Sequence, residues 1–551
     1  MKKRAVVSPL PPPSSSSSIS PLRSSVVFIV TLLWFGVFAM IGMDPHHDGI
    51  MLKCAADVAA GKRLFAETFC QYGDLTILLQ ALALRITGVK LLTIRLLTVL
   101  FYAGSSVLVD RLWGRFLRGG VANSLHLALF WGMVPFTMVT FHPWSSVYAL
   151  FFMLLAAELL LRSLECGENA GPAARWYVFA SGCAAGCAFG CRTPVGVVTG
   201  FAVAAVFLLL FLSGKKEARR QVGVAATAWG LGALAWPVIG ALRITFTGAW
   251  SAYLHQCFRF VGRFAVERGG IAAAASGPNG GLAAAWRKVS ESLFPFNNSL
   301  WPIDLFYGVL PLAVLAAGAL IVCRFRRQKE RNAAAVRLPA LILFALVSWH
   351  QFYPVPCVRH LYWASIPMFG AFVWLLQEMW DARTELLRHR IALRIAVVVL
   401  LLFPAAAVAW RLYSGAINLE GFSARRQAAD QPVLCGMRLN REEWELCRLI
   451  STVTRELPSG IARRGFLNAT ADGLFSLLMP EPAPPFRHPM FVNWNRDVYP
   501  DYPEKLAEFI AERRPVVLTQ VETPPFPGSV CIGGARLRGT LYLFWITPAA
   551  Q

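Results

Sequence analysis

A short cluster of acidic and imidazole side chains, Asp44-Pro45-His46-His47-Asp48-Gly49, comes directly after the first long apolar segment of the chain. Such groups at the edge of a bilayer have no packing reason to be there, and they usually do chemistry or bind a ligand. The elements that hold this cluster follow from the apolar pattern of the whole chain.

The composition identifies the chain as a polytopic membrane protein. Of its 551 residues, 56% are hydrophobic and only 15% are charged, and the mean hydropathy is +0.51. A soluble globular protein does not have this balance. The net charge of +22 does not indicate nucleic-acid binding, because Lys and Arg occur in short clusters between apolar runs, as positive-inside topology requires.

The apolar pattern predicts about eleven membrane-spanning helices, since a crossing takes about 20 predominantly apolar residues. Basic residues before the first span and in alternate loops place the N-terminus inside, and an odd number of crossings then places the C-terminus outside. The predicted spans are residues 25–43, 91–110, 121–141, 144–162, 176–191, 194–214, 222–243, 304–323, 337–352, 361–380 and 391–410.

The first outer loop, residues 44–90, contains a further apolar run from Leu75 to Thr87. This run is short and carries Gln80 and Arg85, so we expect a helix that lies in the membrane interface rather than a crossing. Counting it as a crossing would move the next basic loop to the outside, against the charge rule.

Two segments flank the membrane domain of residues 25–410. Residues 1–24 form a Pro- and Ser-rich tail, which we expect to be disordered in the cytoplasm, and residues 411–551 have the composition of a soluble domain. The predicted architecture is therefore an all-α membrane domain followed by a small extracytoplasmic α/β domain. The clearest elements of that domain are two strands, Pro515 to Thr519 and Thr540 to Trp545, and one helix, Asp501 to Arg514.

The order of elements around the acidic cluster resembles the GT-C superfamily of membrane glycosyltransferases, in particular bacterial protein mannosyltransferases and lipid A aminoarabinose transferases. That family has an acidic residue after the first span, a small-residue helix ending in Gly-Lys, an aromatic-x-acidic element, a Tyr-Gly turn, an interfacial helix and an Arg near the start of the second span. A Gly-rich helix with a basic-x-Pro turn and a late Arg-containing element also match. Here these elements are Asp48, Ala55 and Ala56, Gly61-Lys62, Phe65-Ala66-Glu67, Tyr72-Gly73, Leu75 to Thr87, Arg95, Gly182 to Pro194, and Arg359 to Pro367.

The resemblance implies an inverting glycosyltransferase of the cell inner membrane. It would move a sugar from a polyprenyl-phosphate carrier to a lipid, glycan or protein acceptor at the outer face. An acceptor hydroxyl is a weak nucleophile, and a carboxylate that takes its proton contributes about 10² to 10⁴ in rate. Asp48 is the first choice for this base and Asp44 the second. For Asp44 a structural role stays open, because an Asp before a helix accepts backbone N–H groups.

Other polar side chains are candidates for binding the substrates. Cations stabilise a leaving lipid phosphate, although interfacial arginines also serve as membrane anchors. His46 and His47 suit a phosphate contact, orientation of the base or a divalent metal, and the sequence does not select among these roles. We therefore assign no metal site and no cofactor. The cationic candidates are Arg192, Arg359 and His360, and the further candidates for phosphate or sugar are Lys62, Glu67 and Tyr72.

The cysteines give two further expectations. Cys183, Cys187 and Cys191 alternate with glycines along one helix, which favours a close contact between helices over a metal site. Cys54 and Cys70 share the first outer loop, and a disulfide between them stays open, because spacing alone does not establish the geometry.

Two other classes of function remain as alternatives. A transporter or flippase of lipid-linked glycans would be expected to show internal repeats and charged helices near the midplane, and neither is clear in the sequence. A ligase or polymerase of O-antigen type would carry its functional Arg and His residues in a large late loop. Replacement of Asp48 should abolish sugar transfer in the glycosyltransferase and matter little in the other two classes.

Overall fold

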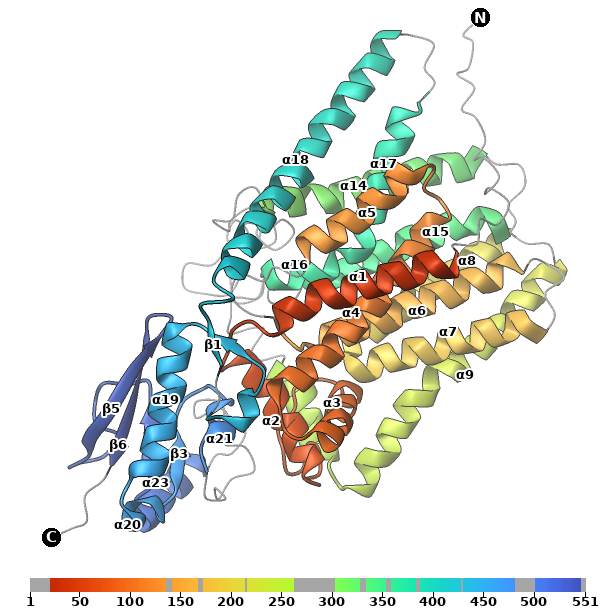
Figure 1. The fold of residues 1–551 in the computed structure, drawn as a ribbon. Helices are drawn as coiled ribbons and strands as arrows, with labels where there is room; N and C mark the ends of the chain where they lie inside the picture. The colour runs from red at the N-terminus through yellow and green to blue at the C-terminus, as the bar shows by residue number, and fades with distance from the viewer. Residues whose placement is uncertain are drawn as a thin grey trace, which may run out of the picture.

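The computed structural model describes residues 20–134, 141–166, 172–213, 216–261, 303–327, 333–352, 358–382, 387–427, 430–480 and 501–546. Most of this part of the chain is helical. The long helices form one bundle, and a small domain with a β-sheet lies at one end of it, next to helix α2 (Figure 1).

The helices of the bundle follow the apolar pattern closely. They are α1 (Pro21–Ala39), α4 (Leu91–Gly114), α5 (Gly120–Met133), α6 (Ser145–Glu165), α7 (Pro172–Cys191), α8 (Thr193–Ser213), α9 (Lys216–Phe246), α14 (Ile303–Arg327), α15 (Ala333–Ser348), α17 (Ile366–Trp380) and α18 (Leu387–Glu420), with the short helices α10 (Trp250–Leu254), η1 (His255–Phe260), η2 (Trp349–Phe352) and α16 (Val358–Ala364) between them.

Within the described residues, eight of these helices are long and apolar enough to cross a membrane: α1, α4, α6, α8, α9, α14, α15 and α18. The prediction of a multi-pass membrane protein is therefore confirmed. The other three predicted spans overlap α5, α7 and α17, and residues 135–140 of the span 121–141 lie outside the described residues. The number of eleven crossings and their orientation stay predictions.

Glycines bring α7 and α9 into close contact. A Cβ atom added at Gly182 would lie 2.1 Å from the carbonyl oxygen of Trp229, and one added at Gly232 would lie 2.2 Å from that of Phe179. Side chains larger than hydrogen would force the two backbones apart. The predicted small-residue contact along the Cys183 helix is thus present.

Residues 44–90, predicted as the first outer loop, form two helices at one end of the bundle. Helix α2 (His47–Ala59) is buried along nearly its whole length, and α3 (Asp74–Thr87) packs against it. Both lie at the same end of the bundle as the C-terminal domain (Figure 1). The helix predicted from Leu75 to Thr87 is confirmed as α3.

The C-terminal domain has a four-stranded sheet in the order β3-β4-β6-β5. β3 and β4 are parallel, whereas β6 is antiparallel to both β4 and β5. Helix α19 packs against β5. The two predicted strands and the predicted helix are confirmed as β4, β6 and α23. The described elements are β1 (Arg426–Gln427), η3 (Pro432–Leu434), β2 (Arg438–Leu439), α19 (Arg441–Glu456), α20 (Ser459–Ala462), β3 (Phe466–Asn468), α21 (Phe475–Leu478), α23 (Tyr502–Arg513), β4 (Val516–Thr519), β5 (Val530–Leu537) and β6 (Thr540–Ile546).

Candidate active site

Asp48 lies in the first turn of α2 and forms a fully buried ion pair with Arg95 of α4. Nη2 of Arg95 lies 2.6 Å from Oδ2 of Asp48, and both side chains are 0% exposed. Nη1 of Arg95 also lies 3.0–3.1 Å from the carbonyl oxygens of Ala39, Ile41 and Gly42. These carbonyls follow the end of α1 and have no partner within that helix. Arg95 therefore joins the end of α1 to the start of α2.

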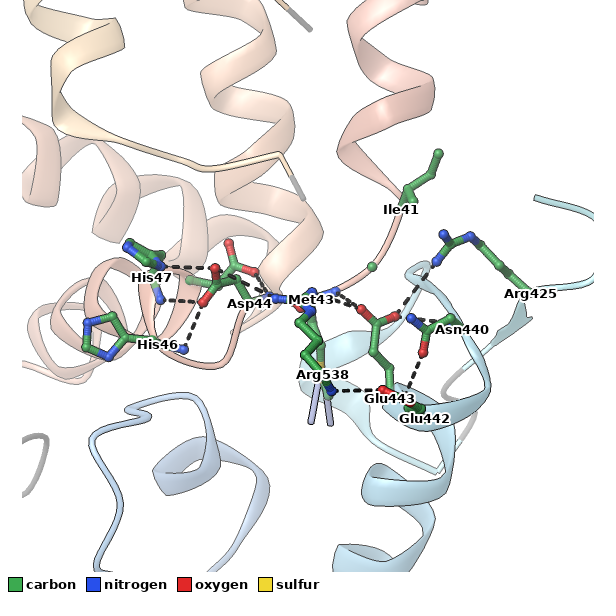
Figure 2. Close-up of polar contacts among 12 residues, drawn as sticks. Ile41, Met43, Asp44, His46, His47, Arg425, Asn440, Glu442, Glu443 and Arg538 are labelled. Carbon is green, nitrogen blue, oxygen red and sulfur yellow. Dashed lines mark hydrogen bonds and ion pairs between the residues drawn. The ribbon is translucent and has the colours of Figure 1, made fainter. Parts of the chain in front are cut away.

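Asp44 lies in the loop between α1 and α2, beside the two histidines (Figure 2). Its Oδ1 accepts hydrogen bonds from the backbone N–H groups of His46 and His47, at 3.1 and 3.0 Å. Its Oδ2 lies 3.0 Å from Nδ1 of His47, and its backbone N–H donates to Oδ2 of Asp48 at 2.7 Å. The structural role left open for Asp44 is thus present, but its second oxygen binds an imidazole.

The two carboxylates have different environments. Burial raises the pKa of Asp44, but the hydrogen bond and charge of His47 and the charge of His142 outweigh burial and hold it below its ordinary value. Burial raises the pKa of Asp48, and the charge of Arg95 only partly opposes this. Neighbouring acids whose pKa values are driven apart in this way are typical of acid–base sites.

A row of aromatic rings leads from Asp44 towards Arg192. The ring of His47 lies 5.1 Å from that of His142 and 5.3 Å from that of Trp144, and Trp144 lies 5.6 Å from Tyr72. Burial raises the pKa of the Tyr72 hydroxyl, and the nearby charge of Arg192 opposes this. The row extends from one candidate base, in the loop before α2, towards one candidate cation, directly after α7.

Arg192 directly follows α7, and its guanidinium donates a hydrogen bond to the hydroxyl of Ser146 in the first turn of α6. His360 is half-buried in α16, with its ring 5.5 Å from that of Trp363. Helix α16 packs against α6. Arg359 lies in α16 as well, and its side chain lies outside the described part of the structure.

Lys62 and Glu67 bind neighbours within the first outer loop. Nζ of Lys62 lies 2.7 Å from Oδ1 of Asp57, and Glu67 accepts hydrogen bonds from the backbone and guanidinium of Arg63. Lys53 contacts the same carboxylate of Asp57. These pairs hold the connection between α2 and α3, so the structure gives Lys62 and Glu67 a local role in the loop. Cys54 and Cys70 are buried free thiols in the same region.

The C-terminal domain adds a third carboxylate to this end of the bundle. Asp472 accepts hydrogen bonds from the hydroxyl of Tyr542 and the amide of Gln520, both at 2.7 Å. Its Oδ1 lies 3.7 Å from Nδ1 of His46, and the same nitrogen donates to the carbonyl oxygen of Ala471 at 3.0 Å. Burial raises the pKa of Asp472.

Sequence reasoning did not single out His142, Trp144 or Asp472. For the first two a signal existed, because His142-Pro143-Trp144 lies at the start of the predicted span of residues 144–162, as Asp44 to Asp48 lies at the end of the first. For Asp472 there was none, because its neighbour His46 is more than 400 residues away in the chain. In the described part of the structure, no group of three or more His, Cys, Asp or Glu residues is arranged to hold a metal ion.

No protein-family model matches the sequence, and no curated protein sequence matches it. Solved structures match its fold. ArnT from Cupriavidus metallidurans bound to undecaprenyl phosphate superposes with a TM-score of 0.52 at 12% identity, over 96% of this chain and 98% of that chain. The oligosaccharyltransferase of Archaeoglobus fulgidus in the apo form gives 0.51 at 11% identity, over 92% and 70%. The same enzyme in complex with an inhibitory peptide and a dolichol-phosphate gives 0.50 at 11% identity, over 91% and 69%.

These proteins are membrane glycosyltransferases of the GT-C superfamily, and this chain has the GT-C fold. At identities of 11–12% the likeness shows the fold alone. The fold class that the motif order predicted is thereby confirmed.

Proposed function

We propose that this chain is an inverting glycosyltransferase. It moves a sugar from a polyprenyl-phosphate-linked donor to a lipid, glycan or protein acceptor at the outer face of the membrane. One observation carries the proposal: in a chain with the GT-C fold, the loop after α1 holds a carboxylate, Asp44, whose Oδ2 lies 3.0 Å from Nδ1 of the His47 imidazole. The undecaprenyl phosphate bound to ArnT supports a lipid phosphate as the leaving group.

Asp44 is the base in this proposal, and Asp48 is a positioning residue. A base must reach the hydroxyl of an acceptor. Asp48 is 0% exposed, and its Oδ2 already binds Arg95 and the backbone of Asp44. Asp44 keeps a small exposed fraction, 6%, and its Oδ2 is paired with an imidazole that can carry a proton onward. In this proposal Asp44 therefore ranks before Asp48, which the sequence analysis placed first.

The reaction is then a single displacement. The proton of the acceptor hydroxyl passes to Asp44 as the hydroxyl oxygen bonds to the anomeric carbon. The bond from that carbon to the phosphate oxygen breaks, and the polyprenyl phosphate leaves with the electron pair. Arg192 stabilises the negative charge that develops on the phosphate, with Arg359 and His360 as further cations. Tyr72 and Trp144 offer faces on which a sugar ring stacks.

The placement of the site rests on the topology. With the N-terminus inside and eleven crossings, α2, α3 and the C-terminal domain lie outside the inner membrane. In Figure 1 these elements lie at one end of the bundle, which supports placing them on the same side of the membrane. A lipid-linked donor reaches the site from the bilayer, and the acceptor reaches it from the side of the C-terminal domain.

Mass spectrometry of co-purifying lipids tests the proposal. A transferase without its base keeps its unreacted donor, so Asp44→Asn protein should carry more polyprenyl-phosphate sugar than wild type does. Asp501→Asn is the matched control, because Asp501 is an exposed carboxylate of the C-terminal domain. If folded wild-type and Asp44→Asn proteins both lack any such lipid, the proposal fails and lipid transport becomes the function to test.

A further inference from the structure

The C-terminal domain binds both backbone polar groups of Met43, the residue directly before Asp44 (Figure 2). The N–H of Met43 donates to Oε1 of Glu443 at 3.2 Å, and its carbonyl oxygen accepts from Nη2 of Arg538 at 2.6 Å. Arg538 and Glu443 also bind each other at 3.2 Å. These contacts join residues 400 and 495 positions apart in the chain.

Arg538 lies at the tip of the hairpin between β5 and β6, in a backbone conformation that is uncommon for a residue with a side chain. Its φ is +51°, and that of Gly539 is +80°. Leu537 pairs with Thr540, so these two residues are the whole turn. Two-residue turns with positive φ at both positions favour Asn-Gly or Asp-Gly. Here an Arg takes the first position, and its N–H donates to Glu442 at 2.8 Å.

Glu443 is the second side chain of the C-terminal domain that binds the backbone of Met43. It is 1% exposed, and its Oε2 accepts from the backbone of Asn440, which closes the capping box at the start of α19. Its Oε1 faces both Met43 and Arg538. A buried carboxylate needs such partners on each oxygen. The start of α19 and the tip of the hairpin therefore act on Met43 together.

The same domain also holds the chain just after Asp44. The N–H of Leu474 donates to the carbonyl oxygen of Pro45 at 3.1 Å. On the side chain of Asp44 itself, Nη1 of Arg538 lies 3.9 Å from Oδ2. That oxygen is the one that faces His47.

We propose that Arg538 is a positioning residue for Asp44, so that the C-terminal domain is part of the active site rather than an appended module. This inference rests on the proposed function, which makes Asp44 the base. The planar guanidinium of Arg presents several N–H groups in a fixed fork, so one side chain binds Met43 and Glu443 while its other nitrogen faces Asp44. Lys has a single nitrogen and keeps part of this arrangement.

Steady-state kinetics of three variants test the role. Arg538→Gln should lower kcat about 10- to 100-fold, because a small displacement of a catalytic group costs up to about 10² in rate, while KM for the lipid-linked donor stays near wild type. Arg538→Lys should recover most of that loss. Arg536→Gln is the matched control, because Arg536 is an exposed residue of β5 two positions earlier, and it should match wild type.

Hydrogen exchange of the peptide covering residues 40–48 gives a readout that does not depend on activity. It should be faster in Arg538→Gln than in wild type or Arg536→Gln, while exchange in β4 stays unchanged. The inference is overturned if kcat per folded Arg538→Gln protein equals wild type, or if exchange over residues 40–48 does not change. A folded wild-type protein without transfer activity would instead refute the proposed function. The exchange result would then still decide whether Arg538 fixes the backbone of residues 40–48.

Discussion

At the scale of single residues, two aspartates four positions apart have different partners. Asp48 meets a buried guanidinium, whereas Asp44 meets an imidazole and the first N–H groups of α2. Type and spacing alone do not distinguish them. What distinguishes them is the partner that another helix brings to each.

Replacing each acid by Asn should have different consequences. Asn caps a helix about as well as Asp does, so Asp44→Asn should keep its melting temperature and lose about 10²- to 10⁴-fold in kcat. Asp48→Asn leaves Arg95 buried without its carboxylate, which costs about 3–5 kcal/mol of stability. Thermal unfolding in detergent and transfer assays on the folded fraction measure the two effects. An Asp48→Asn protein that is stable but inactive would return the role of base to Asp48.

The pH dependence of transfer should report on His47. Burial raises the pKa of Asp44, but the hydrogen bond and charge of His47, together with the charge of His142, hold it below its ordinary value. His47→Leu removes the hydrogen bond and charge of the His47 side chain, so burial is then opposed only by the charge of His142 and the backbone N–H of residue 47. The pKa of Asp44 should therefore rise, and the acidic limb of kcat/KM should move to higher pH. An acidic limb at the same pH in both proteins would contradict the pairing.

At the scale of elements, the contact between α2 and the C-terminal domain depends on Gly49. A Cβ atom at this position would lie 2.2 Å from the backbone nitrogen of Leu474 and 2.7 Å from the carbonyl carbon of Gly473. Because these neighbours are backbone atoms, an added Cβ fits only if α2 or the segment around Leu474 moves. The approach also allows the hydrogen bond from Leu474 to Pro45.

Gly49→Ala should therefore separate α2 from the segment around Leu474. We expect a loss of about 1–3 kcal/mol, as for other overpacked sites, together with a lower kcat. Gly36→Ala is the control, because an added Cβ there meets nothing within 4 Å and alanine favours a helix. Melting temperatures of the two variants in the same detergent decide the question. Equal values would show that the close approach at Gly49 does not matter for stability.

At the scale of the whole molecule, charge is divided between the two ends of the bundle. The start of α6 carries Ser146, which binds Arg192 near the candidate site. Towards its other end, Glu158 and Glu165 bind Arg115, which follows α4. The basic loop after α4 therefore lies at the end of the bundle away from the site, as an internal loop should.

Reporter fusions test the resulting topology. A phosphatase that is active only outside the cytoplasm should be active when fused after Gln551 and inactive when inserted at Gly119, in the loop after α4. This follows from an odd number of crossings and an internal N-terminus. Activity at both positions, or at neither, would refute the odd count. Activity at Gly119 alone would reverse the orientation.

The sequence by itself determined where the helices lie, because hydropathy is a local property that sums over neighbouring residues. Each of the eleven predicted spans overlaps a described helix, and the run from Leu75 to Thr87 is α3. The order of motifs around Asp48 and Arg95 also indicated the GT-C class. Strands β4 and β6 follow from short apolar runs in the same way.

Only the tertiary structure decided which acid is near the surface and which residues surround it. Three contacts join elements that are distant in the chain. They are the ion pair between Asp48 and Arg95, the ring contact between His47 and His142, and the hydrogen bond from Arg538 to the carbonyl oxygen of Met43. Such contacts depend on how a hairpin of one domain docks against a loop of another. No local pattern of charge or hydropathy near either residue encodes that docking, because both partners look like ordinary polar residues until the two surfaces meet.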